Sequence, residues 1–175
     1  MICGCMSFGT GKTTLLNVIA GRASKGVVTG EILLNGKPFV PNESITAGAT
    51  SSDGPTCCYV LQDDAHIPLL TVKESLQYAA MLRFREVSSS SPKVVKAVTE
   101  TMELLGLNAI ADTIIGTPEN RNISCGQLRR LTIAVELVSR PSLLFLDEPT
   151  CKFYGHTRCL PVEKYAFNVQ FMCHS

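Results

Sequence analysis

Long hydrophobic runs and an excess of charge of one sign are both missing from this 175-residue sequence. No stretch of about 18 uncharged apolar residues occurs, so no segment is predicted to span a bilayer. Lys and Arg number 16 against 15 Asp and Glu, a net charge of +1. This balance argues against a nucleic-acid partner, which requires a clustered basic excess. Residues 1–11 lack the basic and apolar regions of a secretory signal, which favours a reducing compartment.

Cysteine is abundant, but the spacing that usually gives it a structural role is absent. None of the eight cysteines belongs to a C-x-x-C pair, so we interpret them mostly as reduced thiols. The alternative is a zinc site near the C-terminus, although the spacing there matches no common zinc finger. Its candidate ligands are Cys151, His156, Cys159, Cys173 and His174.

The sequence does contain alternating strand-like and helix-like segments, at a length typical of one domain. Its first half predicts a glycine-rich turn and helix over residues 9–20 and a hairpin over 31–39 around Asn35-Gly36. A surface loop is expected over 41–56 and a buried strand over 58–61.

Three further helices are predicted in the second half. A capping box formed by Thr71 and Glu74 begins the first, Ser91-Pro92 begins the second, which stops at Gly106, and Ser124 begins the third. Their apolar positions are Leu76, Ala79, Ala80 and Leu82 in the first, Val94, Val95, Val98, Met102 and Leu105 in the second, and Leu128, Leu131, Ala134 and Leu137 in the third.

Residues 142–146 form a continuous apolar run, typical of a parallel-sheet strand that is buried on both faces. Strands that alternate with helices indicate an α/β fold, here with a helical insertion over residues 71–121.

The turn before the first helix has the residues of a phosphate-binding loop. It reads Gly9-Thr10-Gly11-Lys12-Thr13-Thr14. In such a loop, backbone N–H groups cradle phosphates, the lysine reaches the β and γ groups, and a hydroxyl binds Mg²⁺. The G-x-x-x-x-G-K-T pattern is incomplete, because Met6 stands at its first glycine. The alternative is an ordinary glycine-rich helix start.

Two adjacent carboxylates, Asp147 and Glu148, follow the second buried strand. They stand where open α/β sheets bind ligands. Asp147 could hold a metal through water, and Glu148 could polarise the water that attacks a γ-phosphate. An exposed loop is the alternative interpretation.

Two weaker signals accompany these. Ser124, Gly126 and Gln127 lie at a helix start whose backbone N–H groups can bind an anion, although the same residues suit a plain helix cap. Gln62 follows the first buried strand, and its amide could face the metal or the attacking water; a glutamine at such a place is usually inert.

In this order the motifs resemble the nucleotide-binding domain of an ABC transporter, and more narrowly of the G (White-type) half-transporter subfamily. The resemblance covers roughly residues 6–150 and rests on five segments: residues 9–22, 30–36, 59–64, 71–76 and 123–150. It implies a P-loop NTPase fold over 1–150: the three-layer ABC ATPase core with an inserted helical subdomain, about 71–121, that carries the signature motif.

The resemblance also implies roles for individual residues. Those that would bind the phosphates of ATP are Gly9, Thr10, Gly11, Lys12, Thr13 and Thr14. Thr13, Gln62 and Asp147 would hold Mg²⁺, and Glu148 would be the catalytic base. Gln62 would also belong to the ATP-binding residues, as the Q-loop residue that senses Mg²⁺ and the transmembrane partner. Ser124, Gly126 and Gln127 would bind the ATP of an opposite subunit.

The partners that the resemblance implies are a second nucleotide-binding domain, identical or different, and a transmembrane domain that this sequence does not contain. Such an assembly places the domain at the cytoplasmic face of a membrane and involves no nucleic acid.

The sequence departs from the family pattern in three places. Met6 replaces a loop glycine, and Cys125 replaces the first glycine of the signature pair, so a side chain enters a position next to phosphate. Residues 151–175 match nothing in the family, and we interpret them as foreign sequence from a truncated gene. Few residues precede the phosphate-binding loop, so we expect an incomplete sheet with exposed edges.

The leading hypothesis is therefore an ATP-binding and ATP-hydrolysing subunit of an ABC exporter. The main alternative is a catalytically inactive fragment that binds nucleotide or pairs with a full subunit. An inert product of a broken gene is a third interpretation. A small-molecule kinase would fit Gly11-Lys12-Thr13, but the signature segment before Asp147-Glu148 disfavours it.

Overall fold

The computed structural model describes residues 2–3, 11–23, 26–34, 36–39, 57–86 and 88–147. These residues form two compact units. One contains the described residues up to Tyr59 together with 141–147, and the other contains Val60–Arg140. The predicted surface loop over 41–56 and the C-terminal segment 151–175, with its candidate zinc ligands, lie outside the described residues.

The first unit is built on a three-stranded sheet of order β1-β5-β4. Its strands are β1 (Ile2–Cys3), β5 (Leu143–Leu146) and β4 (Cys57–Val60). β1 pairs with β5 in parallel, with Ile2 opposite Phe145 and Cys3 opposite Leu146. Every residue of β4 and β5 is buried, as expected for strands that are covered on both faces. Both predicted strands are present, but the first ends one residue earlier than predicted, and Leu61 is 50% exposed.

Helix α1 (Lys12–Ile19) contributes its apolar side to the core of this unit. That core is one cluster of buried side chains: Leu16, Ile19, Ala20, Phe39, Cys57, Tyr59, Leu143 and Phe145. The cluster joins α1 to β4 and β5, so that burial of apolar surface fixes the helix beside the strands.

A two-stranded antiparallel hairpin is the other element of the first unit. It consists of β2 (Leu33–Leu34) and β3 (Lys37–Pro38), with Leu34 opposite Lys37. Gly36 has φ +76°, a value that the tight turn requires and that glycine adopts without strain. The predicted hairpin is confirmed.

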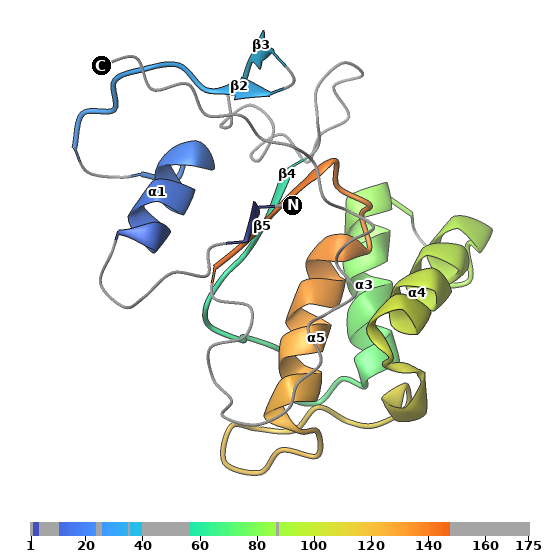
Figure 1. Ribbon diagram of the computed structural model, residues 1–175. Helices are drawn as coiled ribbons and strands as arrows, with labels where there is room; N and C mark the ends of the chain where they lie inside the picture. Colours follow the sequence, from blue (N-terminus) through green and yellow to red (C-terminus); the bar gives the residue numbers. More distant parts are fainter. Residues whose placement is uncertain are drawn as a thin grey trace. The chain divides into compact units, whose positions relative to one another are not determined.

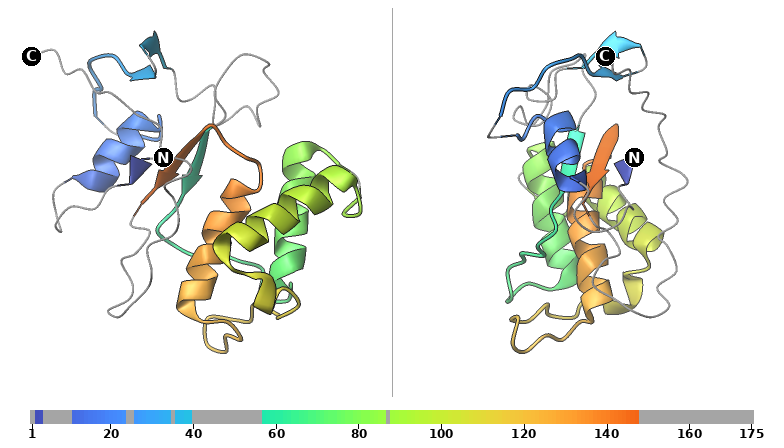
Figure 2. Two further views of the ribbon diagram at one scale, coloured as in Figure 1. Left: turned by 45° about the vertical axis from the view of Figure 1, so that its right-hand side comes forward. Right: turned by 60° about the vertical axis from the view of Figure 1, so that its left-hand side comes forward.

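The second unit is helical: α3 (Val72–Phe84), α4 (Pro92–Leu105) and α5 (Cys125–Leu137) contact one another pairwise (Figures 1 and 2). A short 3-10 helix, η1 (Asn108–Ile110), follows α4. The predicted start of each helix is confirmed, as is the end of α4 at Gly106, which has φ +62°. Residues 71–121 fall within this unit.

Two apolar side chains expected on the buried faces of these helices are in fact exposed. Val95 is 46% exposed and Leu82 is 80% exposed. The buried face of α4 follows Val94, Val98 and Met102, and Val95 lies one residue, about 100°, away from Val94 around the helix. The interpretation of Val95 and Leu82 as core positions is therefore wrong.

Among the described residues, no helix has both the length and the apolar character needed to cross a membrane.

Candidate functional site

The first turn of α1 presents backbone N–H groups in the first unit. Gly11 is the N-cap of α1 and has a left-handed conformation, φ +73° and ψ +17°. A Cβ at Gly11 would meet no atom within 4 Å, so backbone conformation rather than space favours glycine there. The N–H groups of a first helical turn have no carbonyl partner within the helix, and together with the helix dipole they form an anion-binding site.

Asp147, the residue after β5, lies beside this helix start. It is 4% exposed, and its Oδ1 accepts a hydrogen bond of 3.2 Å from the Thr13 hydroxyl. The two residues are 134 positions apart in the sequence. The fold therefore joins the predicted loop threonine to the predicted metal-binding carboxylate.

A tyrosine in β4 contacts the same carboxylate. The Tyr59 hydroxyl donates to Oδ2 of Asp147 at 3.4 Å. The Tyr59 ring stacks with Phe145 at a centroid distance of 6.1 Å, and the Arg22 guanidinium lies 4.8 Å from the ring centroid. Burial, and next the negative charge of Asp147, raise the pKa of Tyr59 to about 12. The hydroxyl therefore remains protonated near neutral pH and can donate to the carboxylate.

Thr13 and Asp147 fit a magnesium ion. Mg²⁺ prefers hard oxygen ligands and is usually held by one or two carboxylates together with phosphate oxygens. Here a hydroxyl and a buried carboxylate lie within hydrogen-bond distance of each other. No cluster of three or more His, Cys, Asp or Glu side chains suited to a metal occurs among the described residues.

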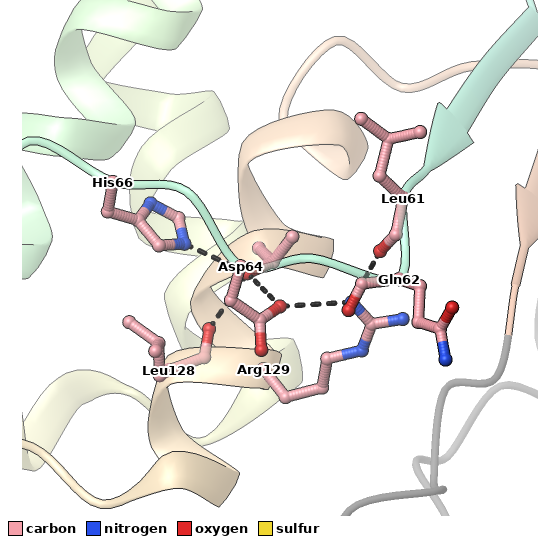
Figure 3. Close-up of polar contacts among 7 residues, drawn as sticks. Leu61, Gln62, Asp64, His66, Leu128 and Arg129 are labelled. Carbon is pink, nitrogen blue, oxygen red and sulfur yellow. Dashed lines mark hydrogen bonds and ion pairs between the residues drawn. The ribbon is translucent and has the colours of Figure 1, made fainter. Parts of the chain in front are cut away.

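Gln62 lies in the second unit, in the segment that follows β4. It is exposed, and its backbone carbonyl is 3.5 Å from Nη1 of Arg129 on α5. The same nitrogen donates to the carbonyl of Leu61 at 2.6 Å and to Oδ1 of Asp64 at 2.9 Å. Figure 3 shows Arg129 reaching from the helix to this segment.

The segment continues to His66, whose Nε2 lies 2.9 Å from the hydroxyl of Thr132 on α5. Burial lowers the pKa of His66, and the nearby Asp64 opposes that shift. His66 is thus predominantly neutral at pH 7.

The residues at the start of α5 form a reciprocal cap. The Ser124 side chain accepts from the backbone N–H of Gln127 at 3.2 Å, and the backbone N–H of Ser124 donates to Oε1 of Gln127 at 2.7 Å. A Cβ at Gly126 would meet no atom within 4 Å, so internal packing does not require glycine there. In this chain alone, Ser124 and Gln127 therefore act as a capping box.

Cys125, at the first position of α5, is half-buried, and its Sγ lies 3.5 Å from Nη1 of Arg121. Among the described cysteines, Cys57, Cys58 and Cys125 form no disulfide. Burial and the neighbouring Cys58 raise the pKa of Cys57 to about 12.

Several predicted site residues lie outside what the structure describes. They are Gly9, Thr10 and Glu148, together with the side chain of Lys12. Thr14 is described as an exposed residue in the first turn of α1.

Sequence reasoning assigned no role to Tyr59, Asp64 or Arg129. A signal existed for Tyr59, because a tyrosine in a fully buried strand needs a hydrogen-bond partner for its hydroxyl. No local signal marked the Asp64–Arg129 pair, whose members are 65 residues apart.

The sequence matches a known family model, described as ABC transporter, over residues 7–151. It is 42% identical over 149 residues to ABC transporter G family member 24 of Dictyostelium discoideum, covering 85% of this chain and 12% of that protein. It is 43% identical over 143 residues to ABC transporter G family member 38 of Oryza sativa subsp. japonica, covering 81% and 9%.

The chain is also 44% identical over 144 residues to ABC transporter G family member 30 of Arabidopsis thaliana, covering 81% of this chain and 9% of that protein. The chain thus spans about a tenth of the length of these relatives. The matched region contains both the Thr13–Asp147 pair and the α5 cap. The chain belongs to the ABC transporter family, whose nucleotide-binding domain has a P-loop NTPase fold.

Proposed function

We propose that the chain is an ATP-binding and ATP-hydrolysing domain of a G-type ABC exporter. The observation that carries the proposal is the hydrogen bond between Thr13, in the first turn of α1, and Asp147, at the end of β5. It joins an anion-binding helix start to a buried acid, as a site for a phosphate and its divalent cation requires.

In this proposal the phosphates of ATP lie at the N-terminus of α1. The residues that bind them are Gly9, Thr10, Gly11, Lys12, Thr13 and Thr14. Backbone N–H groups and the Lys12 ammonium neutralise negative charge, so that the helix start and the lysine act together. Magnesium, when bound, supplies charge neutralisation at the β- and γ-phosphates. Thr13 and Asp147 hold it, with Gln62 as the further ligand that the family resemblance suggests.

Glu148 is proposed as the base. It directly follows Asp147, and its carboxylate orients and accepts a proton from the water that attacks the γ-phosphate. Tyr59 donates to Asp147 from the other side and keeps that carboxylate in one orientation.

The partners proposed are a second nucleotide-binding domain and a transmembrane domain at the cytoplasmic face of a membrane. Ser124, Gly126 and Gln127 at the start of α5 would meet the ATP bound to that second domain. The finer architecture proposed is the three-layer ABC core with an inserted helical subdomain, over residues 1–150.

Lys12→Ala tests this function. We expect the affinity for ATP·Mg²⁺ to fall about tenfold or more, because a hydrogen bond to a charged group contributes about 1.5–3 kcal/mol. The affinity is measured by isothermal titration calorimetry. Lys96→Ala is the matched control, because Lys96 is an exposed lysine of α4. Equal ATP affinity in the wild type and Lys12→Ala would refute the proposed site.

A nucleotide-binding domain without turnover is the second candidate, and Cys125 favours it. Its side chain occupies the first position of α5, where the family has glycine, and it contacts Arg121. If this candidate is correct, Glu148→Gln leaves phosphate release unchanged at the background level. A decrease in phosphate release in Glu148→Gln supports hydrolysis instead.

A further inference from the structure

Arg129 and Thr132 on α5 both contact the segment of residues 61–66, which contains Gln62. Nη1 of Arg129 donates to the carbonyl oxygen of Leu61 at 2.6 Å and lies 3.5 Å from that of Gln62. These are main-chain atoms, so the contact fixes the path of the backbone at Gln62 whatever its side chain does.

Asp64 provides a side-chain contact between this segment and α5. Its Oδ1 accepts from Nη1 of Arg129 at 2.9 Å and from the Thr132 hydroxyl at 2.7 Å (Figure 3). The Arg129 and Asp64 side chains are only 12% and 13% exposed. Removing one partner of a pair so well shielded leaves an uncompensated charge out of water.

The helix that receives these contacts begins with the signature residues. Ser124 caps α5, and Arg129 lies in its second turn. The capping box holds the first turn rigidly to the remainder of the helix. The contact of Arg129 with the backbone at Gln62 therefore links residues 61–66 to the helix whose N-cap is Ser124.

Two other arginines join α5 to the neighbouring helices instead. Arg130, the next residue, donates to the carbonyl oxygen of Leu105 at 3.1 Å and so joins α5 to the end of α4. Arg83 on α3 pairs with Glu136 near the end of α5 at 2.6 Å, with side chains 36% and 23% exposed. Neither contact reaches residues 61–66.

We propose that Arg129 and Asp64 are positioning residues that couple the backbone at Gln62 to the signature end of α5. The inference rests on the proposed function, in which Gln62 helps to hold the magnesium ion that accompanies the bound nucleotide. Neither residue touches nucleotide in this proposal. Their contacts link a change of the backbone at Gln62 to a change at the start of α5.

Hydrogen–deuterium exchange, measured by mass spectrometry on the full chain, tests the coupling. Exchange is followed in residues 11–16, 61–66 and 124–130, with and without the non-hydrolysable ATP analogue AMPPNP and Mg²⁺. In the wild type we expect nucleotide to slow exchange in all three segments.

In Asp64→Asn and in Arg129→Gln, we expect the nucleotide-dependent change at 124–130 to fall at least fivefold. The change at 11–16 and the dissociation constant for AMPPNP remain within twofold of the wild type. The double variant Asp64→Asn/Arg129→Gln leaves no unpaired charge and should fold even if a single variant does not. It is expected to lose the response at 124–130 as well.

Glu136→Gln is the matched control, because it removes one partner of an ion pair on the same helix without touching residues 61–66. It should keep the full response, which separates coupling from a general loosening of α5. The inference is overturned if the double variant keeps the response at 124–130, if Glu136→Gln loses it equally, or if the wild type responds at 11–16 but not at 124–130. Absence of binding and of any response at 11–16 in the wild type refutes the proposed function itself, and the coupling with it.

Discussion

At the scale of single residues, the central group of the candidate site is the buried carboxylate of Asp147. It is nearly fully buried, and two hydroxyls donate to it, those of Thr13 and Tyr59. A buried carboxylate needs such donors, because an isolated charge out of water is very costly. The two hydroxyls reach different oxygens of the carboxylate, and this arrangement fixes its plane.

Tyr59→Phe removes one donor and keeps the ring. The pKa of Tyr59 in the folded protein is raised to about 12 from an ordinary 10, so the folded state retains a proton that the unfolded state loses first. The stability contributed by Tyr59 is therefore fully present below pH 10 and is lost as the pH rises from 10 towards 12. The free energy of unfolding of the wild type minus that of Tyr59→Phe should fall by on the order of 1 kcal/mol over this range.

Urea unfolding of both proteins at pH 8, 9.5 and 11 measures this difference. Because lysines and other tyrosines titrate equally in both proteins, their effects cancel in the comparison. A difference in unfolding free energy that stays constant or grows with pH would contradict the hydrogen bond between Tyr59 and Asp147.

At the scale of elements, the helices of the second unit differ in how their N-termini are capped. Thr71 and Glu74 form a reciprocal capping box on α3, as Ser124 and Gln127 do on α5. The hydrogen bonds from the backbone N–H and then the hydroxyl of Thr71 lower the pKa of Glu74. Ser91 occupies the same position on α4, but its side chain makes no capping hydrogen bond.

Thr71→Ala should therefore destabilise the protein by about 1 kcal/mol, the usual contribution of an N-cap side chain. Ser91→Ala is the matched control, and it should change the free energy of unfolding by less than about 0.5 kcal/mol. Circular dichroism at 222 nm during urea titration measures both. Equal effects of the two substitutions would show that the capping hydrogen bonds of Thr71 contribute nothing.

Element prediction succeeded where the deciding atoms lie within four residues of one another. Three such local features were predicted from the sequence: the capping box of Thr71 and Glu74, the turn at Gly36, and the end of α4 at Gly106. It failed at Val95 and Leu82, because exposure of an apolar side chain depends on which neighbouring helix covers it, and a single helix does not contain that information.

At the scale of the whole molecule, the described residues divide into two compact units. The described part of the second unit is Val60–Arg140, and its buried apolar side chains include Leu76 on α3, Val94 on α4, Leu107 between α4 and η1, and Leu131 on α5. Domains of this size can fold alone when they bury enough apolar surface.

We therefore expect a fragment of residues 60–140 to be helical and to unfold cooperatively in urea. Leu131, which is 0% exposed, is the sensitive position: Leu131→Ala should destabilise the fragment by about 2–5 kcal/mol. Leu82→Ala is the control at an exposed position and should change the stability by less than about 0.5 kcal/mol. A fragment that unfolds gradually, without a transition, would show that the second unit depends on the first.

The candidate site was only partly predictable at this scale. The loop residues and Asp147 follow from their motifs, and the described ones lie where those motifs placed them, Thr13 in the first turn of α1 and Asp147 directly after β5. The roles of all the predicted site residues stay predictions, those of Gly11, Thr13 and Asp147 included. Tyr59 and Arg129 were missed, because each acts on an atom more than 60 residues away.

The sequence by itself determined the kinds of elements, their starts and the order of the motifs, since propensity, capping and turn geometry act within a few residues. Only the tertiary structure decided that Thr13 meets Asp147 and that Arg129 meets Asp64, across 134 and 65 residues. The physical reason is that such pairs form after apolar burial has brought distant segments together. Their geometry is a property of the packed core rather than of any one stretch of chain.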